Sequence, residues 1–184
     1  MAGCLYLCAT PIGNLKDITE RVKETLSEVD LIAAEDTRNS IKILNHYEIS
    51  TPMTSYHEYN KAEKGRQLVR EMENGKNIAL VTDAGTPAIS DPGEDLVKRC
   101  IEAGIEVTYI PGAVALITGL ILSGLPTGRF AFEGFLSVNK AERRERLQEL
   151  ATERRTMLFH EAPHKLKATL KDLATAFGED RRIS

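Results

Sequence analysis

This chain is poor in aromatic residues and in cysteine. Its 184 residues include no tryptophan, 5% aromatic residues and only three cysteines, Cys4, Cys8 and Cys100. An odd number of cysteines without a C-x-x-C pair argues against a disulfide framework, so we expect reduced, mostly buried thiols in a cytoplasmic protein. The longest apolar run, "AVALITGLILSG", is too short to span a bilayer, and residues 1–3 lack the basic segment that opens a signal peptide. We therefore expect no membrane association.

Several ligand-binding signatures are missing as well. No G-x-G-x-x-G follows the first apolar run, and there is no P-loop and no G-x-S-x-G elbow. We expect no metal. The chain has 24 basic and 27 acidic residues, and its net charge of -3 gives no indication of nucleic-acid binding. The charge is uneven, because residues 1–139 hold 13 basic and 19 acidic side chains and residues 140–184 hold 11 and 8. The basic end is either a region for an anionic partner or a solvated helix face.

Short apolar runs alternate with amphipathic runs along most of the chain. The pattern predicts strands at 4–10, 31–35, 53–57, 78–83 and 106–112. It predicts helices at 17–29, 38–47, 61–75 and 94–104, and a buried helix at 113–124. This alternation is typical of an α/β fold whose mainly parallel sheet is covered on both faces.

The alternation restarts after "GLPTGR", which indicates a second domain. Strands are expected at 130–136 and 156–162 and helices at 139–154 and 164–177, and "RRIS" looks like the opening of a further strand. We place an N-terminal α/β domain at 1–124 and the start of a C-terminal α/β domain at 125–184. So few strands are too little sheet to stand alone, so we expect this second domain to be truncated.

Unusual sequence follows each expected strand of the first domain. The five exits read "TPIGNLKD", "EDTRNS", "SYHEYN", "DAGTPAISDPG" and "PGAVA", and they are rich in Gly, Pro, Ser, Thr and acidic residues. In open parallel sheets, ligands bind beyond the carboxyl ends of the strands. Glycine lets backbone approach a ligand closely and proline stiffens a loop, while helix starts behind Gly93 and Gly112 favour a carboxylate or phosphate. Any one loop could be an ordinary turn, but three Gly/Pro-bearing loops on one edge favour a small-molecule site.

Several of these segments resemble a known family. In chain order, "ATPIGNLKDIT", "AAEDTR", "SYHEYN", "VTDAGTPAISDPG" and "GLPTGRFAFEGFL" resemble the tetrapyrrole-methylase superfamily and, within it, the branch that methylates ribosomal RNA. The stretch "RRTMLFHEAPHKL" is similar to the second-domain signature of that branch. The resemblance implies two α/β domains with a cofactor cleft between them, S-adenosylmethionine as cofactor, and a homodimer. It also implies 2′-O-methylation of a cytidine ribose in RNA of the small ribosomal subunit.

The resemblance also implies a cofactor site built largely from backbone in these loops. Carried over by motif, the cofactor-binding residues are Pro11, Gly13, Asp83, Ala84, Gly85, Thr86, Ser90, Asp91, Gly93, Pro111, Gly112 and Ala113. Two positions depart from the family pattern. Val114 stands where relatives commonly have serine, which removes a hydroxyl contact, and Gly128 stands where relatives often have aspartate.

Methyl transfer to a ribose hydroxyl needs alignment and a base or strong hydrogen-bond acceptor, because that hydroxyl is a poor nucleophile. The catalytic candidates are Glu35, Asp36 and His57, although the two acids could simply cap a helix and pair with a basic neighbour. We expect Arg38 to hold an RNA phosphate and Tyr56 to stack on a splayed base. The other candidates for substrate binding are Glu58, Asn60, Glu161 and His164. Two other functions remain open: C-methylation of a tetrapyrrole precursor, and a non-catalytic cofactor-binding module.

Overall fold

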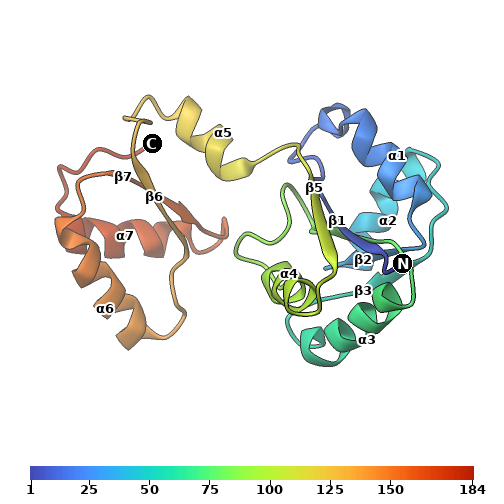
Figure 1. Cartoon of the computed structure of the whole chain (residues 1–184). Coiled ribbons are helices and arrows are strands. Elements are labelled where there is room, and N and C mark those ends of the chain that lie inside the picture. Colours follow the sequence, from blue (N-terminus) through green and yellow to red (C-terminus); the bar gives the residue numbers. More distant parts are fainter. The chain divides into compact units, whose positions relative to one another are not determined.

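A computed structural model describes all 184 residues, which form two compact units (Figure 1). Unit 1 comprises Met1–Ala115 and unit 2 comprises Leu116–Ser184. The sequence suggested a boundary between residues 124 and 125, whereas the units divide at the first turn of helix α5. No helix has both the length and the apolar character that a bilayer crossing requires.

Unit 1 is built on a five-stranded, fully parallel sheet with the order β3-β2-β4-β1-β5. The central strand β4 (Ile78–Val81) is buried along its whole length and pairs with a neighbour on each side. The other strands are β1 (Cys4–Cys8), β2 (Leu31–Ala34), β3 (Met53–Ser55) and β5 (Glu106–Ile110). The expected parallel α/β fold is confirmed.

Four helices connect these strands, and their ends follow capping rules. They are α1 (Glu20–Glu28), α2 (Thr37–His46), α3 (Lys61–Glu73) and α4 (Gly93–Glu102), and a short 3-10 helix, η1 (Leu15–Asp17), precedes them. The side chain of Thr19 accepts from the N–H of Val22 and so caps α1, as Asp36 caps α2 by accepting from the N–H of Arg38. Gly104 follows α4 with a φ of +69°, a conformation that glycine adopts without strain.

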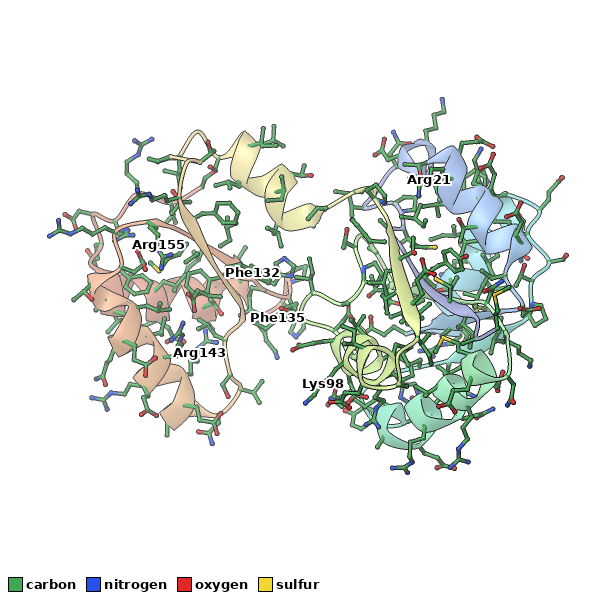
Figure 2. All side chains as sticks on the ribbon, viewed as in Figure 1. Arg21, Lys98, Phe132, Phe135, Arg143 and Arg155 are labelled. Carbon is green, nitrogen blue, oxygen red and sulfur yellow. The ribbon has the colours of Figure 1, made fainter.

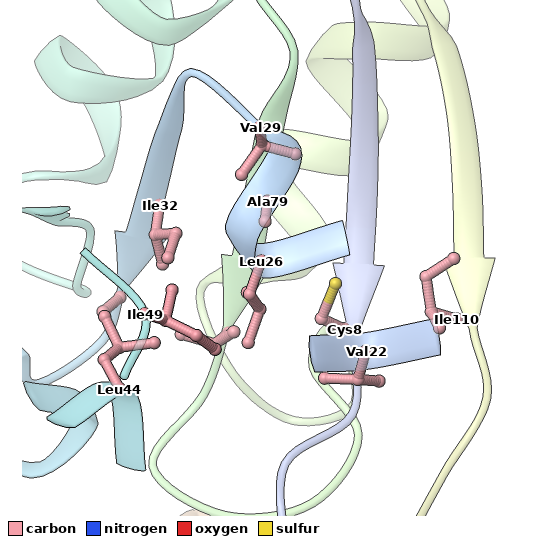
Figure 3. Packing of buried hydrophobic residues seen from close by; sticks show 11 residues of the cluster. Cys8, Val22, Leu26, Val29, Ile32, Leu44, Ile49, Ala79 and Ile110 are labelled. Atoms are coloured by element: carbon pink, nitrogen blue, oxygen red, sulfur yellow. The ribbon is translucent and has the colours of Figure 1, made fainter. Parts of the chain in front are cut away.

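The core of unit 1 has two layers, one on each face of the sheet. On one face, Val22 and Leu26 of α1 and Leu44 of α2 pack against Cys8 and Ile32 (Figure 3). On the other face, α3 and α4 bring Leu68, Met72, Leu96 and Cys100 against Leu5, Ile78 and Leu80. All three cysteines are buried and free, as expected, and burial raises the pKa of the Cys8 and Cys100 thiols to about 12. These thiols therefore behave as small apolar core residues.

Unit 2 contains a parallel pair of strands and three helices. They are α5 (Ala115–Leu122), β6 (Phe130–Phe135), α6 (Lys140–Glu149), β7 (Thr156–His160) and α7 (Leu166–Phe177), with a short 3-10 helix, η2 (Leu150–Thr152), after α6. Arg143 on α6 points toward α7 and bonds Asp172 and Thr169 there, at 2.8 and 2.7 Å (Figure 2). A charged network therefore joins these two helices.

One expectation for this part of the chain was wrong. Helix α5 is not a buried helix, because Ile121 and Leu122 are 67% and 79% exposed and only Leu120 is buried. An apolar run is buried only where neighbouring elements cover each of its faces, and most positions of this helix are uncovered. The "RRIS" segment forms no strand; instead, the Arg181 guanidinium donates to the carbonyl oxygen of Glu153 at 3.1 Å.

Candidate ligand site at the carboxyl edge of the sheet

All five strands of unit 1 run in one direction, so the segments that follow them lie along one edge of the sheet. We call this the strand-exit edge. Its segments, in the order of the strands across the sheet, are 56–60, 35–38, 82–93, 9–13 and 111–113. Every site residue that the sequence predicted in unit 1 belongs to one of these segments.

The exits of β1 and β4 are tied together by backbone. The N–H of Thr10 donates to the carbonyl oxygen of Gly85 at 2.8 Å, and the N–H of Gly85 donates back to Thr10 at 3.0 Å. The Thr10 hydroxyl donates to the carbonyl oxygen of Thr82 at 3.3 Å, and the residue is 3% exposed. Sequence reasoning missed Thr10, although a threonine at the end of a buried strand is a recognisable signal.

A third exit joins at Gly85. This glycine has a φ of +83°, and a Cβ placed on it would lie 3.1 Å from Cγ2 of Ile12 and 3.5 Å from the carbonyl oxygen of Ala113. The hydroxyl of Thr86 donates to the same Ala113 carbonyl at 3.1 Å and contacts the hydroxyl of Tyr109 at 2.9 Å. The loops after β1, β4 and β5 therefore converge on a position where only glycine fits without strain.

The second half of the loop at 82–93 is held by one carboxylate. Oδ1 of Asp91 accepts from the N–H of Ala88 at 3.0 Å and from the N–H of Gly93 at 2.7 Å. Burial raises the pKa of Asp91, although these backbone hydrogen bonds act in the opposite direction. Ala88 and Ser90 have φ values of 66° and 60°, which non-glycine residues adopt only where the surrounding structure imposes them. These hydrogen bonds therefore hold the backbone of the loop in one conformation.

The remaining cofactor candidates surround these contacts. Gly112 lies so close to β1 that a Cβ on it would be 2.9 Å from the Cβ of Ala9. Pro11 is buried, while Gly13, Asp83, Ala84 and Pro111 are exposed at the edge. Oδ2 of Asp83 accepts from Asn39 Nδ2 at 3.3 Å, which links β4's exit to α2. Asn39 was not predicted from the sequence, and its position three residues after the capping aspartate is its only signal.

The two acidic candidates at the start of α2 differ in their surroundings. Oε2 of Glu35 accepts from the hydroxyl of Thr82 at 2.7 Å, so this carboxylate faces the exit of β4. Asp36 caps α2, and its carboxylate receives Nε and NH2 of Arg38 at 3.0 and 2.6 Å. Hydrogen bonds from Arg38 hold the pKa of Asp36 down at about 2. Asp36 is therefore ionised but weakly basic, and the Arg38 guanidinium is already engaged.

In the segment that follows β3, the polar side chains bond mostly to neighbouring residues of the same segment. Oδ1 of Asn60 accepts from the N–H of His57 at 2.8 Å, and its Nδ2 donates to the Ser55 hydroxyl at 3.2 Å. Glu58 pairs with Lys61 at 2.6 Å in an exposed position. His57 Nδ1 is buried and has no hydrogen-bond partner, which makes His57 the one histidine here with an unsatisfied ring nitrogen.

Tyr56 requires a correction. Its side chain is 1% exposed, and its hydroxyl donates to Oδ2 of Asp95 on α4 at 3.1 Å. Burial raises the Tyr56 pKa, so the phenol stays neutral. A ring in the core cannot stack on a base, and Tyr56 instead anchors β3 to α4.

Two further candidates lie in unit 2. The carboxylate of Glu161 accepts from the N–H of Ala162 and the hydroxyl of Thr169, which lowers its pKa. His164 is exposed. The sequence "HEAPH" also matches the zinc pattern H-E-x-x-H, a match that our sequence analysis missed, but that pattern needs a helix. Here His160 ends strand β7, so the helical spacing of the two rings is lost.

The fold and this edge define an α/β protein with a candidate ligand site made of converging loops. A family model described as Tetrapyrrole (Corrin/Porphyrin) Methylases matches residues 4–184, and the chain belongs to that family.

Named relatives are close in sequence. The chain is 57% identical over 182 residues to a Synechocystis sp. protein called ribosomal RNA small subunit methyltransferase I, covering 99% of this chain and 65% of that protein. It is 51% identical over 183 residues to the Haemophilus influenzae protein of the same name, covering 100% of this chain and 65% of that one. The chain thus spans about two thirds of the length of these relatives. Among solved structures, uroporphyrin III C-methyl transferase from Thermus thermophilus matches 98% of this chain and 79% of its own, with a TM-score of 0.68 at 18% identity, which supports the fold.

Proposed function

We propose that this chain belongs to an S-adenosylmethionine-dependent methyltransferase that modifies the 2′-oxygen of a cytidine ribose in RNA of the small ribosomal subunit. The convergence of three exit loops on Gly85 is the observation that carries the proposal, because it builds a rigid ligand wall from backbone. The names of the relatives supply the substrate class. We further propose that the protein acts in the cytoplasm, where its three free cysteines would stay reduced, and that it is a homodimer, as the sequence resemblance implies.

The strand-exit edge suits a cofactor with both polar and charged groups. Gly13 turns its loop with a φ of +145° and is exposed, so backbone N–H and carbonyl groups there can bond a ligand's polar atoms. The buried Gly85, with a φ of +83°, has its N–H and carbonyl oxygen bonded to Thr10 and fixes the path of the wall. The residues that would hold the cofactor are Pro11, Gly13, Asp83, Ala84, Gly85, Thr86, Ser90, Asp91, Gly93, Pro111, Gly112 and Ala113. When bound, the sulfonium supplies an activated methyl group for in-line displacement. The protein's part is to orient that group and exclude water.

The acceptor hydroxyl must lose its proton as its oxygen bonds the methyl carbon and the carbon–sulfur bond breaks. Glu35, Asp36 and His57 are the proposed acceptors of that proton, and Glu35 is the first choice because its carboxylate faces the β4 exit. Asp36 is a weak base, since its pKa is about 2. Arg38, Glu58, Asn60, Glu161 and His164 are the proposed contacts to RNA.

The test uses this chain in the longest form that its gene encodes. Titration calorimetry with S-adenosylmethionine measures cofactor binding first. Labelled cofactor is then incubated with unmodified small ribosomal subunits and, separately, with uroporphyrinogen. We expect label in the RNA, at a ribose 2′-oxygen after nuclease digestion.

Each other outcome contradicts the proposal in a different way. Label in the porphyrin and none in RNA would make the protein a tetrapyrrole C-methyltransferase. Cofactor binding without label in either acceptor would contradict the RNA assignment while leaving the cofactor site intact. A folded protein that does not bind the cofactor would be a binding module for another ligand.

A further inference from the structure

Unit 2 contains a cavity whose lining includes no residue of the strand-exit edge. Its volume is about 410 Å³, and it is lined by Pro126, Gly128, Arg129, Arg154, Arg155 and Thr156. These residues precede or begin β6 and β7, so the cavity sits at the amino ends of the two strands. The candidates Glu161 and His164 follow the opposite, carboxyl end of β7. We call this feature the arginine cavity.

The walls of the arginine cavity are fixed by the fold. Phe130 pairs with Thr156 in the register of β6 and β7, which brings the two preceding segments side by side. The buried Thr156 hydroxyl donates to the carbonyl oxygen of Pro126 at 2.7 Å and closes one wall. The Arg181 guanidinium donates to the carbonyl oxygens of Glu153 and Arg155, at 3.1 and 3.4 Å, and so holds the segment that precedes β7.

The cavity carries positive charge that the protein does not neutralise. Arg155, labelled in Figure 2, is paired with Glu153 at 2.6 Å. Arg129 and Arg154 are both exposed and take part in no ion pair. The carboxylate of Glu133, which acts electrostatically on Arg155, is bonded by Arg146 at 2.6 Å. Two guanidinium groups at the cavity are therefore free to bind an anion.

We propose that the arginine cavity binds phosphate groups of the RNA backbone. Guanidinium groups bond phosphate oxygens in a planar, bidentate way and keep their charge at any physiological pH. Unit 2 as a whole has 12 basic and 9 acidic side chains, which favours an anionic partner over a cationic one. The choice of RNA as the source of the phosphate rests on the proposed function. Phosphate contacts of this kind position a nucleic acid without reading its sequence.

The test compares charge-removing variants with a matched control. Arg129→Ala and Arg154→Ala, combined in one protein, remove the two unpaired guanidinium groups. Arg144→Ala removes an equally exposed arginine of α6 that does not line the cavity. Binding of a labelled single-stranded oligoribonucleotide of mixed sequence is measured by fluorescence anisotropy over a range of salt concentrations.

We expect the double variant to raise the Kd for the oligoribonucleotide about tenfold and to reduce the slope of log Kd against log salt by about 1.4, or about 0.7 per lost phosphate contact. Arg144→Ala leaves the Kd within about twofold. The Kd for S-adenosylmethionine stays unchanged in both variants, because the residues lie outside the cofactor loops.

Three outcomes would overturn the inference. The first is an RNA affinity and salt slope of the double variant equal to those of Arg144→Ala. The second is tight binding of inorganic phosphate that RNA does not displace, which would make the cavity a site for a small anion. The third is loss of affinity for an acidic peptide but not for RNA, which would make it a protein-docking site. Methyl transfer is measured separately on the unaltered protein. A protein that binds RNA through the cavity but transfers no methyl group contradicts the proposed function alone.

Discussion

Single residues decide the shape of the strand-exit edge, and Gly85 is the clearest case. Its φ of +83° strains any residue with a Cβ, and a Cβ there would lie only 3.1 Å from Cγ2 of Ile12. The shape of the candidate site therefore depends on Gly85 more than the stability of the fold does, because the stability comes mainly from the buried sheet behind the loops. A substitution there separates binding from folding.

Replacing Gly85 by valine should weaken cofactor binding far more than it weakens folding. The positive φ costs about 1–2 kcal/mol for a residue with a Cβ. The contact with Ile12, at 3.1 Å from the Cβ alone, also shifts the loop. We expect the Kd for S-adenosylmethionine to rise at least about tenfold, which equals about 1.4 kcal/mol. Gly104→Val is the matched control, because that glycine has a φ of +69° and open space around it. Equal loss of affinity in both variants, measured by calorimetry, would contradict this view of Gly85.

At the scale of elements, the loop at 82–93 is kept in a strained path by one side chain. Asp91 bonds two backbone N–H groups across the positive-φ residues Ala88 and Ser90. An asparagine can accept the same two hydrogen bonds through its Oδ1 atom, whereas an alanine cannot. The pair of substitutions therefore isolates the hydrogen bonds from the charge.

We expect Asp91→Ala to lower the free energy of unfolding by about 1–3 kcal/mol and Asp91→Asn by less than about 0.5 kcal/mol. The pKa of Asp91 is raised in the folded state, so the neutral form is the favoured one. Its contribution is therefore present below the ordinary value of 3.8 and is lost as the pH rises through the folded-state pKa. Urea unfolding from about pH 3 to about pH 6 should thus show Asp91→Asn gaining on the native protein as the pH rises. A difference between the two that does not change with pH would show that the Asp91 carboxyl is not perturbed.

Much of the whole molecule could be predicted from the sequence. The alternation of apolar and amphipathic runs predicted every strand and long helix of unit 1, because the residues themselves carry those periods. Tyr56 could not be placed, since its partner Asp95 is distant in sequence and only the tertiary fold brings the two together. The exposed face of α5 was missed for a related reason. The apolar sequence of this helix indicates that it could be buried, but it does not indicate which neighbouring elements cover it.

The local roles of the site residues were predictable only where backbone geometry demanded a residue type. The glycines at 85, 93 and 112 were named from the family resemblance, and the structure gives a reason for glycine there, because a Cβ at each would meet another atom within about 3.1 Å. Thr10, Thr82 and Asn39 were not found, because threonine and asparagine occur widely and their hydrogen bonds join segments far apart in the chain. The positions of the loops could thus be predicted from the sequence, whereas the contacts between the loops are seen only in the structure.

The two units should also differ in local stability, and hydrogen exchange on the intact chain can measure this. In unit 1, β4 is buried throughout and lies between β1 and β2, with a hydrophobic layer on each face of the sheet. In unit 2, β6 has one buried residue and pairs only with β7. Amides open with a free energy that follows local burial and pairing, so the most protected amides of β6 and β7 should exchange at a free energy at least about 2 kcal/mol below those of β1 and β4. Equal protection in both sets would mean that the two units unfold as one cooperative body, which would contradict their description as separate compact units.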